Sequence, residues 1–246
     1  MTIPAHTGEL PYLTTSQMIE VDRAMMEDFR IDLVRMMENA GRALAHLARV
    51  RFLGGDPRGK KVVVLAGTGG NGGGALVSAR RLQNWGARVK VYVTRPDEKF
   101  TPVPAHQLDI LRRMNVPVHP GEAFAEDDPA DLVLDGVIGY SLQGAPTGTA
   151  GKLIRWANAQ NAPVLSLDAP SGVDTTTGTV FDPAVQATAT MTLALPKEGL
   201  RAPGVKAHVG ELYLADISVP PSLYDGPGLG IAAGHLFAQS DIIRLP

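Results

Sequence analysis

The sequence of 246 residues contains no cysteine and no marked excess of either charge. Without cysteine, disulfides, thiolate metal sites and a cysteine nucleophile are excluded. No stretch reaches the roughly 18 apolar residues that a membrane-spanning helix needs, so we expect no membrane span. The 23 basic and 25 acidic side chains nearly balance, which gives no electrostatic reason for binding nucleic acid or an anionic membrane. We therefore expect a small-molecule partner.

The first residues, Met1 to Pro4, show neither the basic segment nor the long apolar core of a secretory signal. A cytoplasmic location is the resulting expectation. Hydrophobic residues make up 44% of the chain, which is enough for a proper core. The length suits one α/β domain spanning residues 1–246.

Two amphipathic helices are predicted within residues 14–53, before any strand. Thr14 and Gln17 have the spacing of a capping box, and apolar residues then recur every three or four positions as far as Phe29. Asp32 is a candidate cap for the second helix, whose apolar stripe ends ahead of a Gly-Gly-Asp-Pro stop. At this spacing the methionines indicate core packing rather than a binding surface.

After these helices, short apolar runs alternate with helical patterns. This alternation predicts a doubly wound, mostly parallel sheet with helices on both faces. The Pro- and Gly-rich segment 220–234 is expected to be irregular. Strands are predicted at 61–65, 88–93, 116–118, 132–134, 163–167, 187–195 and 211–215, and helices at 73–85, 104–114 and 148–160.

A glycine-rich loop joins the first predicted strand to the following helix. Six of the nine residues of Ala66–Gly74 are glycine. Glycine lets the backbone approach a ligand closely, and the helix N-terminus directs amide hydrogens at an anion. The loop therefore predicts a phosphate-bearing ligand, although a tight turn alone could also use some of these glycines.

The same loop matches the G-x-G-x-x-G pattern of nicotinamide dehydrogenases, beginning at Gly67. In such enzymes the second strand ends in Asp or Glu, which holds the ribose hydroxyls. Here Val93 is followed by Thr94 and Arg95, so that carboxylate is missing. A dehydrogenase stays an alternative, in which Arg95 is either a contact for a 2′-phosphate or a solvated side chain.

Two aspartates lie at the ends of predicted strands. Asp135 and Asp168 each fall at the carboxyl end of a predicted strand, where ligands bind in doubly wound sheets. If the strands are neighbours, both carboxylates are expected on one rim facing the glycine loop, one holding a hard cation and the other acting as acid or base. Alternatively, either aspartate only caps its loop. Lys197 follows a later strand and either reaches this rim or is a surface lysine.

In four pieces, the chain resembles the YjeF N-terminal family of NAD(P)H-hydrate epimerases. Residues 13–18 and 37–41 resemble the family's leading helices, and Gly67–Ala75 is similar to its G-P-G-N-N-G-G-D-G signature. Asp135 to Gly139 resembles its D-x-x-x-G element, and Asp168 to Gly172 resembles its D-I-P-S-G element. Lys197 is similar to a family lysine after a late strand.

The resemblance implies a Rossmann-like homodimer that interconverts the R and S forms of hydrated NADH and NADPH (NADHX and NADPHX). It implies a potassium ion held by Asn71, Asp135 and Ser171, and Asp168 as general acid/base at ring carbon C6. Lys197 would be an accessory residue, and a separate S-specific dehydratase would consume the product. The substrate contacts would be Gly70, Asn71, Gly72, Gly73, Gly74, Gly139, Tyr140, Ser141, Leu142, Gln143, Gly144, Ala145 and Asp168.

Four positions depart from the family signature. Thr68 replaces proline, Gly70 replaces asparagine, Gly74 replaces aspartate and Ala75 replaces glycine. Because the loop loses an amide and a carboxylate, a non-catalytic nucleotide-binding or protein-interaction module of the same fold is the alternative to the epimerase. From the length we expect no kinase-like dehydratase domain of the kind that is fused to this module in some relatives.

Overall fold

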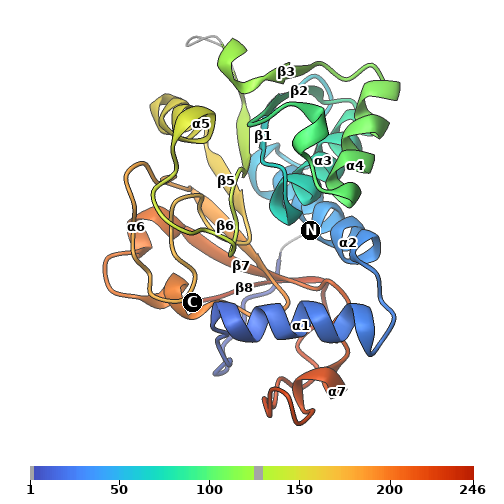
Figure 1. Ribbon diagram of the computed structural model, residues 1–246, viewed down its shortest axis with the longest axis vertical. Coiled ribbons are helices and arrows are strands. Elements are labelled where there is room, and N and C mark those ends of the chain that lie inside the picture. The colour runs from blue at the N-terminus through green and yellow to red at the C-terminus, as the bar shows by residue number, and fades with distance from the viewer. Residues whose placement is uncertain (1–2, 125–129) are drawn as a thin grey trace.

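A computed structural model describes residues 3–124 and 130–246 and contains one eight-stranded sheet (Figure 1). The strand order is β3-β2-β1-β4-β5-β6-β7-β8, and all neighbours are parallel except β7 and β8. This architecture confirms the predicted Rossmann-like, mostly parallel sheet. The strands are β1 (Lys61–Ala66), β2 (Arg88–Val93), β3 (Val118–Pro120), β4 (Leu132–Gly136), β5 (Val164–Leu167), β6 (Ala189–Leu193), β7 (Glu211–Ala215) and β8 (Ile242–Arg244).

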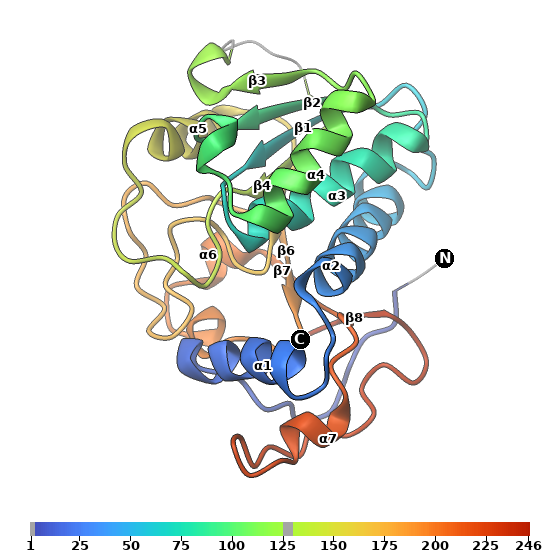
Figure 2. The ribbon, with the colours of Figure 1, turned by 45° about the vertical axis from the view of Figure 1, so that its right-hand side comes forward.

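Helices cover both faces of the sheet. In Figures 1 and 2, α2, α3 and α4 lie on one face and α5 lies on the other, while α1 crosses near α7. A π-helical turn, Ala48–Phe52, continues α2. The helices are α1 (Thr15–Glu27), α2 (Leu33–Leu47), α3 (Gly70–Asn84), α4 (Pro102–Arg113), α5 (Gly148–Ala159), α6 (Lys206–Val209) and α7 (Pro221–Tyr224), with 3-10 turns at Asp97–Lys99, Gly121–Ala123 and Glu198–Arg201.

The two leading helices form as predicted. The Thr14 hydroxyl accepts from the backbone N–H of Gln17, and the Gln17 side chain accepts in return from the N–H of Thr14, which completes the capping box. The Asp32 side chain caps α2 by accepting from the N–H of Arg35 at 3.2 Å. The apolar stripe of α1 is buried, and α1 therefore forms a wall beside the sheet.

The core lies in two layers, one on each side of the strands. Leu76 on α3 and Leu108 on α4 pack on one face, and Leu153 and Trp156 on α5 pack on the other. Burying a leucine of this kind stabilises the fold by about 1.5–3 kcal/mol. Residues 62–66 of β1 are all buried, because a central parallel strand is covered on both sides.

Some predicted boundaries were wrong. Helix α3 begins at Gly70 rather than at residue 73, because close backbone packing of the glycines overrides their low helix propensity. The third strand is displaced toward the C-terminus, and β3 begins at Val118. The segment 220–234 contains one helical turn, α7, and β8 was not predicted because three residues carry too little pattern.

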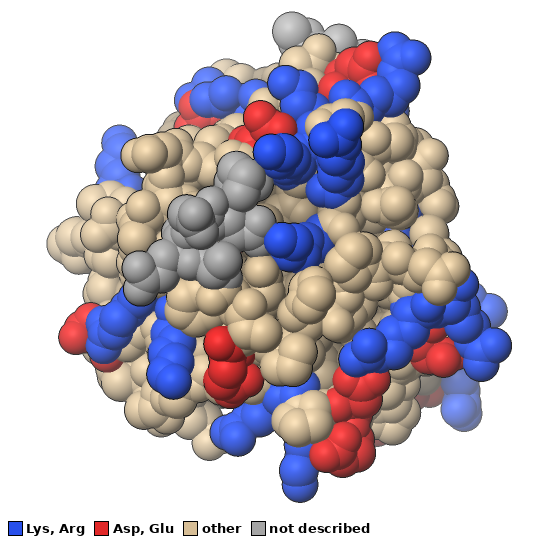
Figure 3. Space-filling model, turned by 90° about the horizontal axis from the view of Figure 1, so that it is seen from above, with Lys and Arg blue, Asp and Glu red and all other residues tan. Residues whose placement is uncertain are grey.

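Charged side chains of opposite sign lie next to one another at several places on the face shown in Figure 3. Many form ion pairs, such as Arg112 with Asp97 at 2.6 Å and Arg113 with Asp109 at 2.6 Å. Such exposed pairs contribute little stability, about 0–1 kcal/mol each. Among the described residues, no helix has the length and apolar composition to cross a membrane.

Candidate active site

A cavity of about 540 Å³ opens where the strand order reverses, at the carboxyl ends of β1 and β4. Ligands of doubly wound sheets bind at this switch point. One wall is the loop after β1 with the first turn of α3, and the other is the loop after β4 with the first turn of α5. No side chain caps the N-terminus of α3, so its amide groups remain available to an anion.

Two glycines of the loop are required by close backbone contacts. A Cβ atom on Gly72 would lie 1.8 Å from the carbonyl oxygen of Gly67, and one on Gly67 would lie 2.0 Å from the carbonyl oxygen of Val137. By contrast, a Cβ on Gly70 would meet nothing within 4 Å. Gly67 and Gly72 therefore shape the loop, whereas Gly70 leaves space in front of it.

A second cavity of about 410 Å³ adjoins the first. It lies between α1, α2 and the ends of β5 and β6, and much of its wall is apolar, including Met18, Met36 and Leu193. Gly70, Asn71 and Tyr140 line both cavities. A single elongated ligand can therefore extend from one cavity into the other.

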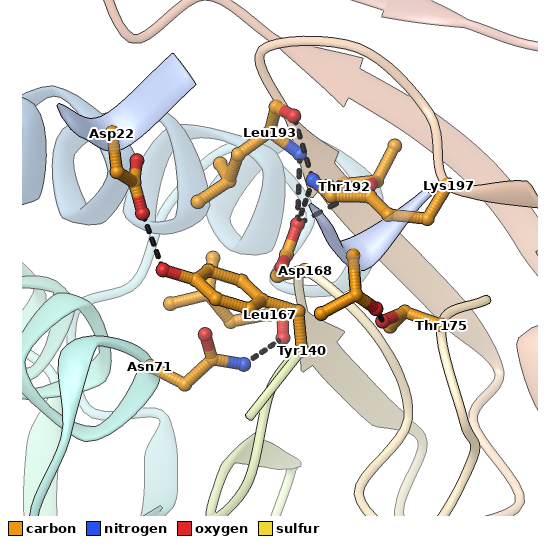
Figure 4. Close-up of polar contacts among 10 residues, drawn as sticks. Asp22, Asn71, Tyr140, Leu167, Asp168, Thr175, Thr192, Leu193 and Lys197 are labelled. Atoms are coloured by element: carbon orange, nitrogen blue, oxygen red, sulfur yellow. Dashed lines mark hydrogen bonds and ion pairs between the residues drawn. The ribbon is translucent and has the colours of Figure 1, made fainter. Parts of the chain in front are cut away.

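Asp168 and Lys197 form a buried ion pair on the wall of the second cavity (Figure 4). The Lys197 side chain is fully buried, and Asp168 is 2% exposed. The ammonium of Lys197 also donates to the Leu193 carbonyl at 2.8 Å and to the Thr192 hydroxyl at 3.3 Å. The structure thus places Lys197 at the rim rather than on the surface.

The backbone at Asp168 is unusual for a residue with a side chain. Its φ angle is +66°, in the left-handed region, and its N–H donates to the Met191 carbonyl on β6 at 2.7 Å. Aspartate is one of the few non-glycine residues that tolerate this region, and such conformations concentrate at functional sites. The conformation turns the chain directly after β5 and directs the carboxylate toward Lys197.

A second pair, Asp22 and Tyr140, also lines this cavity. Tyr140 follows β4, and its hydroxyl donates to the carboxylate of Asp22 on α1 (Figure 4). Burial raises the pKa of Asp22, while the Tyr140 hydrogen bond and the nearby Lys197 charge lower it and the Asp168 charge raises it. Burial and the Asp22 carboxylate raise the pKa of Tyr140, which keeps the phenol protonated.

Asp135 lies on β4, next to β5, but it does not face either cavity. It is fully buried and accepts from the Ser171 hydroxyl at 2.6 Å, the Ser171 N–H at 2.9 Å, the Ser166 hydroxyl at 2.8 Å and the Val137 N–H at 3.2 Å. The expectation that both carboxylates lie on one rim facing the glycine loop was therefore wrong, because these four donors turn Asp135 inward. Burial raises its pKa.

Asn71 connects this buried cluster to the cavities. Its side-chain amide donates to the Leu167 carbonyl at 2.6 Å, next to Asp168. Its Oδ1 lies so close to Gly139 that a Cβ there would stand 2.3 Å away. The residue before Gly139, Ile138, donates its N–H to the Ser171 hydroxyl at 2.9 Å. Asn71, Asp135 and Ser171 thus lie along one short path of contacts.

The other residues expected to contact substrate divide into three groups. Gly72, Gly139 and Ser141 line the first cavity, together with Arg95 from the end of β2. Gly73 and Gly74 lie within α3, where a Cβ would meet the side chains of Met37 and Leu167 respectively. Gly73 and Gly74 line neither of these two cavities, and the same holds for Leu142, Gln143, Gly144 and Ala145.

The sequence analysis missed Asp22. Its only signal was a carboxylate beside the buried positions Val21 and Met25 of an amphipathic helix, which is weak because the edge of an apolar stripe often carries a charge. Only the packing of α1 over the strand ends brings Asp22 to the cavity.

An uncapped, glycine-rich helix N-terminus at the switch point, beside a strand-end aspartate, defines an α/β protein with a site for an anionic, nucleotide-like ligand. A family model described as "YjeF-related protein N-terminus" matches residues 34–199. The chain belongs to this family.

Individual relatives agree with this assignment. The chain is 43% identical over 221 residues to an NAD(P)H-hydrate epimerase of Dehalogenimonas lykanthroporepellens, a match covering 88% of this chain and 86% of that protein. It is 33% identical to a bifunctional NAD(P)H-hydrate repair enzyme of Salinibacter ruber over 87% of this chain, but it spans only 42% of that longer protein. The crystal structure of the yeast protein YNL200c, at 23% identity, has the same fold, with a TM-score of 0.79 over 96% of this chain and all of that one.

Proposed function

We propose that this protein is an isomerase that interconverts the R and S epimers of hydrated NADH and NADPH, a step of nicotinamide nucleotide repair. One observation carries the proposal: the buried Asp168–Lys197 pair and the N-terminus of α3 face two adjoining cavities with shared walls. The 43% identical relative that bears the epimerase name covers most of the chain and supports the same activity.

The two cavities suit the two ends of a dinucleotide. The pyrophosphate fits the amide groups at the start of α3, and the remaining nucleotide fits the 540 Å³ cavity. The reduced pyridine ring then enters the 410 Å³ cavity, where Met18, Met36 and Leu193 shield it from water. In this arrangement the ring lies beside Asp168.

Asp168 is the proposed general acid/base at C6 of the ring, the carbon that carries the hydroxyl group. Loss of that hydroxyl requires a proton, and its return releases one. The Lys197 ammonium, bonded to Asp168 and to the Leu193 carbonyl, holds the carboxylate in place. Proton transfer by a positioned group of this kind contributes about 10²–10⁴-fold to rate.

We also propose a potassium site formed by Asn71, Asp135 and Ser171. The three side chains offer oxygen donors, which suit a hard cation, and the hydrogen-bond donors to Asp135 among the described residues are all neutral. A bound potassium ion would offset the charge of this buried carboxylate and fix the loop after β4 against α3. Removing potassium is therefore expected to slow turnover.

For the assembly we propose a homodimer, as in the family. Exposed apolar side chains lie on α1 and just after it, an apolar surface that a second copy can cover: Ile19 and Met26 on the helix and Phe29 beyond its end are 40% to 55% exposed. Light scattering on the purified chain tests this point. The product, the S epimer, is proposed to pass to a separate S-specific dehydratase.

The proposed activity is tested by following loss of the R epimer while an S-specific dehydratase removes the S epimer, with potassium or sodium present. We expect this protein to accelerate loss of the R epimer well above its spontaneous rate, more so in potassium. An unchanged rate, combined with a hydrate-induced rise in melting temperature, would favour the non-catalytic binding module instead.

A further inference from the structure

Reaction at both faces of C6 poses a requirement that Asp168 alone does not meet. An epimerase must remove the hydroxyl from one face of the ring carbon and return it to the other face. A group that transfers protons must be within about 2.6–3.2 Å of the oxygen it serves. A flat ring bound in the 410 Å³ cavity therefore needs polar groups on two of its walls.

The cavity supplies two such pairs from different elements. Asp168 and Lys197 follow the strands β5 and β6, whereas Asp22 comes from α1 and Tyr140 from the loop after β4 (Figure 4). All four residues line the cavity, and each pair is joined by its own hydrogen bond. Apolar side chains, among them Met36, make up much of the remaining wall.

We infer that Tyr140 is a second catalytic residue, which transfers protons at the face of C6 opposite to Asp168. Asp22 positions the Tyr140 hydroxyl and takes up the proton. This inference rests on the proposed function. Tyr140 fits this role because it lines both cavities and its hydroxyl donates to the Asp22 carboxylate. That bond orients the phenol and leaves its oxygen free to accept from a water molecule.

The step balances without any oxidant or reductant. For the epimer whose hydroxyl faces Asp168, the Asp168–Lys197 pair donates a proton, and the C6–O bond breaks with its electron pair leaving on water. The lone pair of the ring nitrogen N1 forms the N1=C6 double bond. Water then adds to C6 from the other face, the N1=C6 electrons return to N1, and Tyr140 accepts the proton of that water while passing its own to Asp22. Exchange with solvent water then removes the proton from Asp22 and returns one to the Asp168–Lys197 pair, which restores both pairs for the next turnover.

Burial favours a proton on Asp22, since it raises the pKa of this carboxylate. The geometry supplies the route for that proton, because Asp22 is the acceptor of the Tyr140 hydroxyl and is only partly exposed. Without Tyr140, water can still leave and return on the Asp168 face, so hydroxyl exchange and inversion become separable.

The test incubates each pure epimer in ¹⁸O-labelled water with the parent protein, Tyr140→Phe or Asp22→Asn. The parent is expected to invert C6 and to place label in both epimers. Each variant is expected to lose at least about 10²-fold in inversion, while still exchanging label into one epimer only. Tyr224→Phe is the matched control, since this buried tyrosine has no hydrogen-bond partner for its hydroxyl among the described residues and lines neither site cavity.

Three results would overturn the inference: inversion by Tyr140→Phe at the parent rate, loss of exchange and inversion together in variants that melt like the parent, or inversion by the parent without uptake of label. If the parent does not invert C6 at all, the proposed function fails and the inference fails with it. If the parent inverts C6 and Tyr140→Phe inverts it at the same rate, the inference fails while the proposed function stands.

Discussion

The Asp168 carboxylate and the Lys197 ammonium form an ion pair inside the protein, although 29 positions separate them in the chain. The adjacency of β5 and β6 brings them together, because each residue follows one of these strands. Neither side chain is more than 3% exposed, so each charge depends on the other for compensation.

Lys197→Met is therefore expected to destabilise the fold as well as the site. Removing one partner leaves an uncompensated buried charge, which costs roughly 3–5 kcal/mol. Thermal unfolding should show a clear decrease in melting temperature, and turnover should decrease with it. Lys206→Met, at an exposed position of α6, is the control and should melt like the parent. A Lys197→Met variant as stable and active as the parent would argue against the ion pair.

The glycine loop is expected to respond differently at two neighbouring positions. Gly72→Ala places a Cβ 1.8 Å from the Gly67 carbonyl oxygen, so we expect a loss of at least about 2 kcal/mol in the free energy of unfolding. Gly70→Ala meets nothing within 4 Å and should change stability by less than about 1 kcal/mol. Urea unfolding of both variants checks this contrast, and equal losses would contradict the described loop.

Much of the fold could be predicted from the sequence, because strong periodic patterns determine it. The capping box at Thr14 and the strand-end positions of Asp135 and Asp168 followed from local spacing. The orientation of Asp135 did not, because it depends on donors from Ser166 and Ser171 on another segment. Contacts between segments that are distant in the chain leave no pattern in the local sequence.

Among the residues whose place in the site could not be predicted from the sequence, Asp22 matters most. Its sequence position marks it only as a polar residue on a helix, and its role depends on where α1 packs. For Lys197 the sequence left two alternatives, a surface lysine and a rim residue, and only the β5–β6 pairing decides between them. The cavity itself forms only when α1 and α2 pack against the ends of β5 and β6.

The carboxyl of Asp22 should titrate above the usual range for aspartate, since burial raises its pKa. Three groups act on it as well: Tyr140 by its hydrogen bond and Lys197 by its charge lower the pKa, and Asp168 by its charge raises it. In Tyr140→Phe the stabilising hydrogen bond is gone, so the pKa should rise further. Carboxyl ¹³C NMR titrations of the parent and the variant measure both values, and a lower value in the variant would contradict the contact.

The linked effect on stability has a definite sign. A carboxyl whose pKa is raised in the folded state binds its proton more tightly there than in the unfolded chain. Asp22 therefore contributes most to stability below the usual aspartate pKa, and that contribution decreases as the pH rises through the folded-state value. Asp22→Asn should flatten this part of the pH dependence.

Arg95 is expected to influence the choice between the two hydrated nucleotides. It lines the 540 Å³ cavity at the end of β2, where a dinucleotide fold places the adenosine ribose. Arg95→Ala should raise KM for hydrated NADPH several-fold more than KM for hydrated NADH, because only the former carries a 2′-phosphate. Equal changes for both substrates would show that Arg95 does not contact this phosphate.

The central claim is that Asp168 catalyses inversion at C6, and the most direct measurement follows each pure epimer to equilibrium by NMR. With the parent protein, both starting epimers should converge rapidly on one R-to-S ratio. Asp168→Asn should converge at least about 10²-fold more slowly. Because it leaves the buried Lys197 charge without its partner, its rate is measured at a temperature at which circular dichroism shows the variant to be folded. Asp109→Asn, an exposed change on α4, is the control. Convergence by Asp168→Asn at the parent rate would contradict the account.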